Sequence, residues 1–569
     1  MRFRVVLIFL FLILGTRLFF LQVIQYERCR RLSEETRLIL MPLRAPRGKI
    51  LDREGKILAT SVPGFSVFVE RGITRNEIEL LSELSGVSVE EMKKRMERGG
   101  NPARVLSKVS PEVISGIAEK KEMLPHVRID IEPMRYYPLG PISSHFLGYV
   151  AQISEEELST FRGYRMGDKV GKKGIERFYE EYLKGKDGAR YLEVDAKGRI
   201  IGDMPERENP PRPGHTLILS ISRDLMEHAY EWMKPYAKGA CVAINPNTGE
   251  VLLYISKPGY DPHPFETGIS PEEWKKLVTD TLSPLWDRVS RGGYPPGSVF
   301  KIITALAGLE KGILTPETEF LPCEGSMWVG NRKFLCWSRH GKLDLYGAIV
   351  QSCDIYFYQV GLRLGVKEIC DFSRKIGLSG KTGIDLPDEG ESFIPDIEWF
   401  NRRYGRRGWG KGNACNLAIG QGEILLTPLK IACIFSGIVN GGLVPVPHLL
   451  LRVVDEEGKT VYEYTPSFHR LPVKKENLEF LVHAMEGVVK EDKGTGILAR
   501  IEGVRVGGKT GTAQNPHGED HSLFVGFAPV EHPEIVVVAV LENAGHGGSH
   551  AAPLVKKIIE YYLSLDKEE

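Results

Sequence analysis

An almost unbroken hydrophobic run from Val5 to Ile24 stands near the start of the chain. Twenty helical residues at ~1.5 Å each span ~30 Å, which matches one hydrocarbon core. The run continues into the charged segment LQVIQYERCRR without a small-residue cleavage site, so we predict an uncleaved membrane anchor rather than a removed signal peptide. A helix buried in a protein core is the alternative.

The hydrophobic pattern after the anchor changes at a proline-rich segment, residues 208–215. Before it, short strand-like runs alternate with charged helical segments such as residues 77–100. Proline and glycine clusters of this kind mark plausible domain boundaries. We therefore predict a tail at 1–4, a membrane span at 5–24, a first domain at 25–212 and a second domain at 213–569.

Strand patterns lie at both ends of the second domain. Residues 239–256 predict a hairpin, because two alternating runs flank an Asn-Thr-Gly turn. Residues 504–514, 521–530 and 534–543 predict three strands, and an amphipathic helix follows at 552–565. Mostly helical sequence lies between these ends, so we predict an α+β domain with a helix-flanked sheet closed by its own two ends.

Composition narrows the class of protein without identifying it. The chain has 569 residues, of which 42% are hydrophobic and 26% charged, and this excludes disordered, collagen-like and multi-spanning proteins. The net charge of +1 gives no sign of a nucleic-acid partner. Eight cysteines without a CxxC pair are too few for a disulfide scaffold.

A candidate nucleophile, Ser298, lies three residues before Lys301 in the segment YPPGSVFK. Two prolines and a glycine set a rigid turn before a helical pattern, so both side chains fall on one face of the first helical turn. The helix amino terminus favours a serine alkoxide and lowers the pKa of the lysine. A desolvated, neutral lysine can then take the serine proton without a histidine.

The SxxK and KTG motifs each have a competing copy that order and context disfavour. Ser564 and Lys567 repeat the SxxK spacing, but they follow every other motif in a charged tail. A first KTG begins at Lys381 in a glycine-rich turn, whereas a second lies in a strand entered through two glycines, which let a substrate backbone approach. The favoured set is Ser298 and Lys301, Ser352 and Asp354 in QSCD, and Lys509, Thr510, Gly511 and Thr512.

These elements resemble the SxxK, SxN and KTG motifs of penicillin-binding proteins and serine β-lactamases. The segments IGQGEILLTPLKIA and FVGFAP are similar to a transpeptidase domain, while RGKILDREGKILA and GIERFYEEYLKGKDG resemble the amino-terminal pedestal of class B enzymes. Within class B, the pattern is most similar to the elongation-type enzymes. The resemblance implies a β-lactamase-like catalytic domain on an elongated, mixed α/β pedestal, residues 25–212.

The resemblance also implies a role for each motif. Ser298 attacks the carbonyl of a D-Ala-D-Ala stem peptide, releases D-Ala and passes the acyl group to the amine of a neighbouring stem. Lys301 accepts the serine proton, and Ser352 relays a proton to the leaving amine. Lys509, Thr510 and Thr512 hold the substrate carboxylate, and the backbone N–H groups of Ser298 and Thr512 form the oxyanion hole. No cofactor takes part.

Asp354 departs from the general motif, which has asparagine there. A carboxylate beside Lys301 favours the charged ammonium and makes that lysine a poorer base, unless Lys509 absorbs the charge. Elongation-type relatives commonly carry aspartate at this position, so we interpret Asp354 as a subgroup feature.

Three cysteines and a histidine gather between the first two motifs. Cys323, Cys336, His340 and Cys353 fall within 31 residues, and a Cys3His set suits a structural, tetrahedral zinc. Because Cys353 lies between Ser352 and Asp354, a metal would brace the second motif. A disulfide with a spare thiol, or three buried reduced cysteines, are the alternatives.

The resemblance implies the surroundings as well. The expected partners are peptidoglycan stem peptides and glycan strands, β-lactams, and a SEDS-type glycosyltransferase contacted through the anchor and pedestal. Arginines are more frequent after the anchor than before it, which naively places the body in the cytoplasm, but long domains translocate regardless of charge. Since peptidoglycan lies outside the bacterial cytoplasmic membrane, we expect a cytoplasmic amino terminus and a periplasmic body. A division-type transpeptidase, a β-lactam sensor or β-lactamase, and a non-catalytic scaffold are the alternatives.

Overall fold

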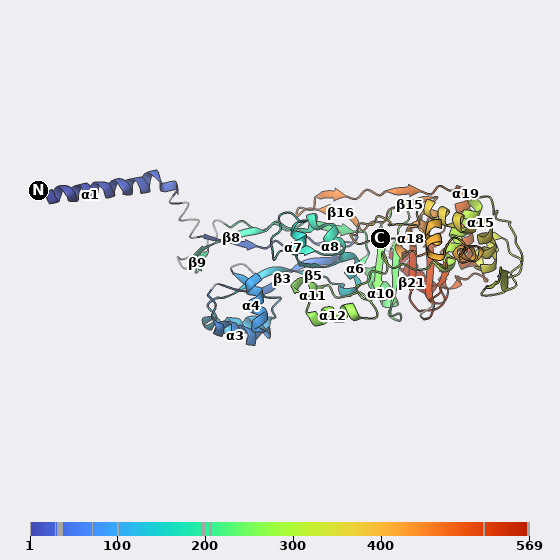
Figure 1. The fold of residues 1–569 in the computed structure, drawn as a ribbon, viewed down its shortest axis with the longest axis horizontal. Coiled ribbons are helices and arrows are strands. Elements are labelled where there is room, and N and C mark those ends of the chain that lie inside the picture. Colours follow the sequence, from blue (N-terminus) through green and yellow to red (C-terminus); the bar gives the residue numbers. More distant parts are fainter. Residues whose placement is uncertain are drawn as a thin grey trace.

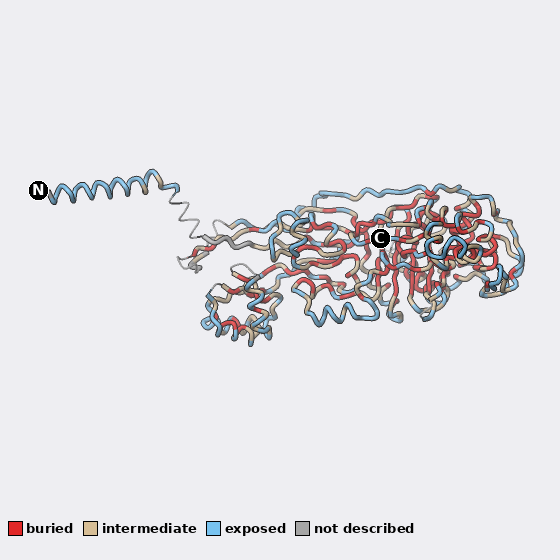
Figure 2. Tube along the Cα trace, viewed as in Figure 1, coloured by how far each residue is buried: buried red, intermediate tan, exposed pale blue. Residues whose placement is uncertain are grey.

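The computed structural model describes residues 2–28, 30, 38–70, 72–98, 102–194, 200–203, 208–515 and 518–565. Helix α1 (Arg2–Phe19) continues into a π-helical turn, η1 (Phe20–Ile24), and projects from one end of an elongated body (Figure 1). The stretch Phe3–Ile24 is long and apolar enough to cross a membrane, and none of its most apolar window is buried. Figure 2 shows the whole helix as exposed. The alternative of a buried core helix is therefore wrong.

The pedestal contains two small sheets and part of a larger one. β1 (Leu38–Leu43), β8 (Gly188–Val194) and β9 (Ile200–Asp203) form a three-stranded sheet nearest the anchor, and β6 (Val150–Gln152) pairs with β7 (Lys169–Gly171). A helical lobe with its own small core contains α3 (Arg75–Ser85), α4 (Val89–Arg98) and α5 (Pro111–Glu119). The remaining pedestal helices are α6 (Ser144–Leu147), α7 (Glu155–Leu158), α8 (Gly174–Phe178) and α9 (Glu180–Leu183).

A seven-stranded sheet joins the pedestal to the catalytic domain. Its order is β17 (Thr460–Glu463), β16 (Leu450–Val454), β10 (Thr216–Leu219), β2 (Ile50–Leu51), β3 (Ile57–Val69) and β4 (Ala103–Ser107), with β5 (Val127–Tyr136) paired to β3. β10 runs parallel to β2 on one side and antiparallel to β16 on the other. Strands of the pedestal and strands of the catalytic domain therefore share one hydrogen-bonded layer.

The buried carboxylate of Asp385 fastens the same junction. It accepts hydrogen bonds from the backbone N–H groups of Leu449 and Leu450 at 2.7 and 2.9 Å, and from the pedestal hydroxyl of Tyr179 at 2.8 Å. Burial raises the pKa of Asp385, and these three donors oppose that effect. A single carboxylate thus ties the pedestal to the catalytic domain.

A buried ion network holds the pedestal together. Glu176 is fully buried and accepts from Arg135 Nε at 2.6 Å and from Arg47 Nε at 2.5 Å, while Arg47 also bonds Glu180 at 2.6 Å. Burial raises the pKa of Glu176, but the two guanidinium groups outweigh it and lower that pKa. The charges in this network therefore depend on one another.

We expect Glu176→Gln to lower the free energy of unfolding by about 3–5 kcal/mol, because it leaves Arg135 buried without its counter-ion. Thermal and urea unfolding of the detergent-solubilised full chain measure this. Glu79→Gln is the matched control, because Glu79 pairs with Arg75 at an exposed site and should lose under about 1 kcal/mol. An equally small loss for Glu176→Gln would contradict the prediction.

The catalytic domain is organised around a five-stranded antiparallel sheet. The order is β12 (Val251–Lys257), β11 (Gly239–Ile244), β21 (Ile535–Leu541), β20 (His521–Ala528) and β19 (Gly507–Ala513). Every residue of the central β21 is fully buried, so helices cover both faces of the sheet. α10 (Arg223–Trp232) and α20 (Ala551–Leu565) pack beside each other, and α18 (Pro428–Val439) packs on β11 and β21. The predicted α+β sheet, closed by both ends of the domain, is confirmed.

The remaining elements of the domain surround this core. They are α11 (His263–Thr267), α12 (Pro271–Thr279), η5 (Gly297–Phe300), α13 (Lys301–Glu310), β13 (Ser326–Val329), β14 (Arg332–Leu335), α14 (Leu345–Val350), α15 (Asp354–Lys375), α16 (Ile397–Tyr404), α17 (Lys411–Ala418), β15 (Leu443–Pro445), β18 (Phe468–Arg470) and α19 (Lys475–Lys490). Short 3-10 turns complete the described structure at Lys121–Met123, Gly140–Ile142 and Ile497–Ala499.

Candidate active site

Ser298 lies in the single helical turn η5, directly before the buried helix α13 that begins with Lys301. The Ser298 side chain is half-buried, whereas Lys301 has no exposed surface. Gly297, just before the serine, has a φ of +52°, a conformation that favours glycine. The chain therefore presents the serine at the rim of the domain and its lysine in the interior.

The second motif contacts Lys301 directly. Lys301 Nζ donates to the backbone oxygen of Ser352 at 2.7 Å, to Ser352 Oγ at 3.2 Å and to Asp354 Oδ1 at 2.8 Å. These three oxygens fix the position of Lys301 Nζ beside the second motif. Ser352 adopts a φ of +52°, which is uncommon for a residue with a side chain and is held only by its surroundings.

The third motif reaches the same serine from the sheet. Lys509, on β19, is fully buried and donates to Ser352 Oγ at 2.9 Å. Burial, and then the charge of Lys301, lower the pKa of Lys509 well below its usual value, while Asp354 partly opposes them. The hydroxyl of Ser352 thus lies between two lysines of different electrostatic character.

The strand that carries Lys509 also presents hydroxyl groups. Thr510 Oγ1 lies 3.4 Å from Lys509 Nζ and 2.8 Å from Thr495 Oγ1. Thr512 follows on the same strand and is less buried than Thr510. Thr495 carries no motif in the sequence, so only the fold reveals that it positions Thr510.

Gly420 and Gln421, in the segment IGQGEILLTPLKIA, link the serine turn and β19. The backbone N–H of Gly297 donates to the oxygen of Gly420 at 3.0 Å, and Gln421 Nε2 donates to the oxygen of Thr512 at 2.9 Å. A Cβ atom on Gly297 would lie 2.4 Å from the Thr512 oxygen. Close backbone packing therefore sets the spacing between Ser298 and Thr512, whose N–H groups are the predicted oxyanion donors.

The competing motif copies lie elsewhere. Lys381 is exposed, and its backbone oxygen accepts from Lys430. Ser564 lies on α20, where its hydroxyl donates to the backbone oxygen of Tyr561, and Lys567 lies outside the described residues. Neither copy joins the site around Ser352.

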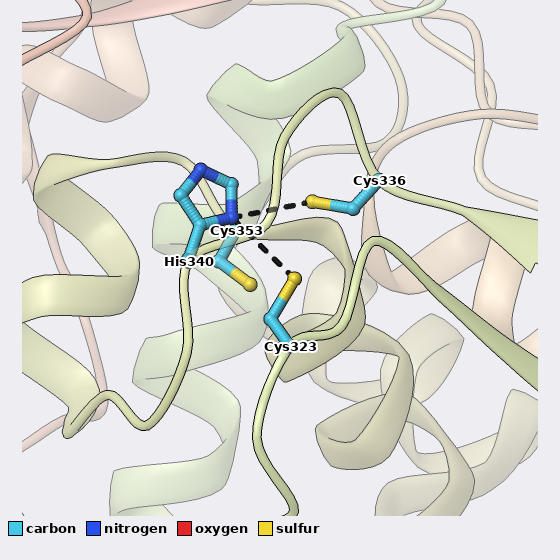
Figure 3. Close-up of side chains that lie close together, drawn as sticks. All are labelled: Cys323, Cys336, His340 and Cys353. Atoms are coloured by element: carbon cyan, nitrogen blue, oxygen red, sulfur yellow. Dashed lines mark hydrogen bonds between the residues drawn. The ribbon is translucent and has the colours of Figure 1, made fainter.

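Cys323, Cys336, His340 and Cys353 form one cluster behind the second motif (Figure 3). Their ligand atoms all lie within 4.8 Å of one another, and His340 Nδ1 lies 3.5 Å from the sulfurs of both Cys323 and Cys336. All three cysteines are free, so the alternative of a disulfide among them is wrong for this structure. A hydrogen bond from the Cys353 thiol lowers the pKa of Cys336 to about 5, and the backbone N–H of Asp354 also donates to its sulfur.

Two domain families match this chain. The Penicillin-binding Protein dimerisation domain matches residues 42–219, and the Penicillin binding protein transpeptidase domain matches residues 239–560. The Haemophilus influenzae protein described as "Peptidoglycan D,D-transpeptidase MrdA" is 32% identical and covers 97% of this chain and 89% of its own length. The chain therefore belongs to the penicillin-binding proteins.

Solved structures narrow the group. A penicillin-binding protein 2 (PBP2) from Helicobacter pylori, in complex with MreC, superposes with a TM-score of 0.82 at 29% identity and covers 93% of this chain and 99% of its own. A chain from "Structural coordination of polymerization and crosslinking by a peptidoglycan synthase complex" gives 0.72 at 30% identity, covering 99% and 98%. Together with the MrdA relative, these place the chain in class B, in the PBP2 group, as the sequence resemblance predicts.

Proposed function

We infer that this protein is a peptidoglycan D,D-transpeptidase that crosslinks stem peptides through an acyl-enzyme on Ser298 during cell-wall elongation, and that penicillins acylate the same serine. The observation that carries the inference is Ser352 Oγ, which lies 3.2 Å from Lys301 Nζ and 2.9 Å from Lys509 Nζ. One hydroxyl between two buried lysines is suited to move a proton, and the lysine of the first motif follows the half-buried nucleophile by one helical turn.

The chemistry follows from these positions. Ser298 Oγ attacks the penultimate D-Ala carbonyl while its proton passes to Lys301. Ser352 passes a proton to the leaving amine of D-Ala, and it removes one from the acceptor amine in the second half-reaction. The N–H groups of Ser298 and Thr512 stabilise the oxyanion, at about 3 kcal/mol for each donor.

The substrate carboxylate is held by the hydroxyls of Thr510 and Thr512, with Lys509 behind them. Lys509 is fully buried, so it does not contact the carboxylate from an open surface. It holds Ser352 in position and lies beside the Thr510 hydroxyl that binds the carboxylate. An arriving carboxylate also favours the charged form of Lys509 and so couples substrate binding to the proton balance of Ser352.

Covalent labelling of the full-length chain with a fluorescent penicillin tests the assignment of the nucleophile. We expect one label per chain on wild type and none on Ser298→Ala, since no other residue replaces the serine nucleophile. Ser564→Ala, which removes the serine of the competing SxxK copy, is the control and should label normally. Equal labelling of wild type and Ser298→Ala would overturn the proposal.

The surroundings proposed for the enzyme agree with its fold. A membrane span at 5–24 after a cytoplasmic tail at 1–4 carries a periplasmic pedestal at 25–212 and a catalytic domain at 213–569. A SEDS-type glycosyltransferase supplies the glycan strand and contacts the anchor and pedestal. The similarity to a chain of a peptidoglycan synthase complex, and to a PBP2 bound to MreC, supports such membrane partners.

We further propose that Cys323, Cys336, His340 and Cys353 hold a structural zinc ion. Tetrahedral zinc with Zn–S bonds of about 2.3 Å and Zn–N bonds of about 2.0 Å requires S···N separations of about 3.5 Å, which matches the two distances of 3.5 Å to His340 Nδ1. Three thiolates and one imidazole leave no open position. The ion would brace the loop that holds Ser352 and would take no part in the chemistry.

Elemental analysis of the full chain, purified without chelator, should find about one zinc per molecule. Cys323→Ser should reduce the zinc content strongly and lower the unfolding temperature, because one of four ligands is lost. Cys370→Ser removes a buried cysteine of α15 outside the cluster and should retain the metal. Wild-type protein without zinc would end this proposal.

A further inference from the structure

The hairpin β13–β14 carries an exposed aromatic and cationic surface next to the second motif, and the catalytic steps above do not use it. Trp328, Leu335 and Trp337 are 67%, 64% and 63% exposed. Resting on the proposed function, we propose that this surface, the hairpin face, binds the acceptor strand of peptidoglycan and positions its stem amine at the acyl-enzyme.

One side of the hairpin is anchored and the other is free. Phe334 is buried, its ring lies 5.2 Å from that of Tyr358 on α15, and the Tyr358 hydroxyl donates to the backbone oxygen of Leu335 at 3.1 Å. The register pairs Trp328 with Lys333 and Ser326 with Leu335. Since paired residues point to the same side of a sheet, Trp328, Lys333 and Leu335 share the face opposite Phe334.

The free face continues into the catalytic site. Trp337 Nε1 donates to the backbone oxygen of Gln351 at 3.2 Å, one residue before Ser352. The Trp337 ring also meets that of His340 edge-on, with centroids 5.0 Å apart. A molecule lying on the hairpin face would therefore reach the second motif without crossing the rest of the domain.

The chemistry of the face fits a glycopeptide strand. Lys333 adds an exposed cation to the hairpin face, and Arg339, which follows the hairpin, is also exposed. Arg332 lies on the Phe334 side instead, and Lys342 pairs with Glu319. Stem peptides that end in D-Ala-D-Ala carry carboxylates, which guanidinium and ammonium groups bind. Flat, rigid indole rings bury the apolar faces of sugar rings at little entropic cost.

The order of the two half-reactions indicates that the hairpin face binds the acceptor strand rather than the donor strand. The donor carboxylate is held by Thr510 and Thr512 on β19. The amine of the acceptor must enter where the leaving D-Ala departed, because the same hydroxyl, that of Ser352, serves both proton transfers. Trp337, which follows the hairpin, contacts the residue before Ser352, so we place the acceptor path along the hairpin face.

Three measurements on the full-length chain separate acceptor binding from catalysis. Fluorescent penicillin reports acylation alone. Exchange of a free D-amino acid onto the stem reports turnover with a small acceptor. Crosslinking of isolated, uncrosslinked peptidoglycan reports use of a strand acceptor. For Trp328→Ala and Lys333→Glu we expect crosslinking to fall about five- to tenfold, with labelling and exchange within about twofold of wild type.

Two further variants of the same chain serve as controls for the hairpin variants. Trp274→Ala removes another exposed tryptophan, on α12, and should change none of the three measurements, whereas Trp328→Phe should retain most crosslinking. Unchanged crosslinking in both hairpin variants, or an equal fall in all three measurements, would overturn the proposal. So would a defect seen only when a partner protein is added, since the face would then bind protein. Wild type without label or crosslinks would instead refute the proposed function.

Discussion

Lys301→Met should slow acylation of Ser298 by penicillin roughly 10²- to 10⁴-fold, the usual contribution of a positioned general base. Methionine fills most of the space of the lysine side chain but cannot take the serine proton. It also leaves Ser352 O and Asp354 Oδ1 without their donor at 2.7 and 2.8 Å, so the second motif loses its support together with the base. Stopped-flow or time-resolved labelling measures the rate.

Lys430→Met is the matched control for this variant. Lys430 is also buried, but it donates to the backbone oxygens of Gly377 and Lys381. We expect it to lower the unfolding temperature and to leave the acylation rate within a few-fold. Acylation of Lys301→Met at a rate similar to that of the control would show that another group accepts the proton.

Gly297→Ala should reduce acylation and crosslinking about 10²- to 10³-fold, the effect of losing one oxyanion donor. The new Cβ would lie 2.4 Å from the oxygen of Thr512, so the serine turn and β19 must separate. That separation moves the N–H groups of Ser298 and Thr512 apart, although every catalytic side chain is still present. The acylation rate constant of the purified full chain measures the effect.

Gly312→Ala shares the backbone penalty of this variant without the clash. Gly312 has a φ of +68°, and nothing lies within 4 Å of its Cβ position. We expect a loss of about 1–2 kcal/mol in stability with normal acylation. If Gly297→Ala also acylates normally, the close contact with Thr512 does not set the oxyanion geometry.

The elements at both ends of the catalytic domain could be predicted from the sequence because their signals are local. Residues 239–256 alternate around a short turn, and the residues that become β19, β20 and β21 follow one another as hairpins. The pairing of β10 with β2 could not be predicted in this way. It joins a two-residue strand to one more than 150 positions later, and such short parallel strands have no periodicity of their own.

In the active site too, features with a local sequence signal could be predicted and long-range contacts could not. Local context distinguished Lys509 from Lys381 in the sequence, because the second KTG lies in a strand entered through two glycines and the first lies in a turn. Gly420 contacts the serine turn through its backbone and Gln421 contacts β19 through its side chain, and both contacts join segments that are far apart in the sequence. No local pattern indicates that Ser352 takes a positive φ.

The sequence left open that Lys509 neutralises the charge of Asp354, and the structure shows a different pairing. Asp354 bonds Lys301 at 2.8 Å, whereas Lys509 bonds Ser352. Lys509 therefore does not take up the carboxylate by direct contact, and burial together with the charge of Lys301 lowers the pKa of Lys509 well below its usual value.

The sheet shared by β2, β10 and β16 connects the pedestal to the catalytic domain through backbone hydrogen bonds, so the two parts should move together. Strands resist stretching, and the Asp385 contacts remove a hinge where two domains would otherwise meet. A tilt of the pedestal must therefore swing the distal catalytic domain as one piece, and a small rotation near the anchor becomes a large displacement of Ser298. If the proposed membrane partner binds the pedestal, its movement would change the distance of the active site from the membrane without altering the site itself.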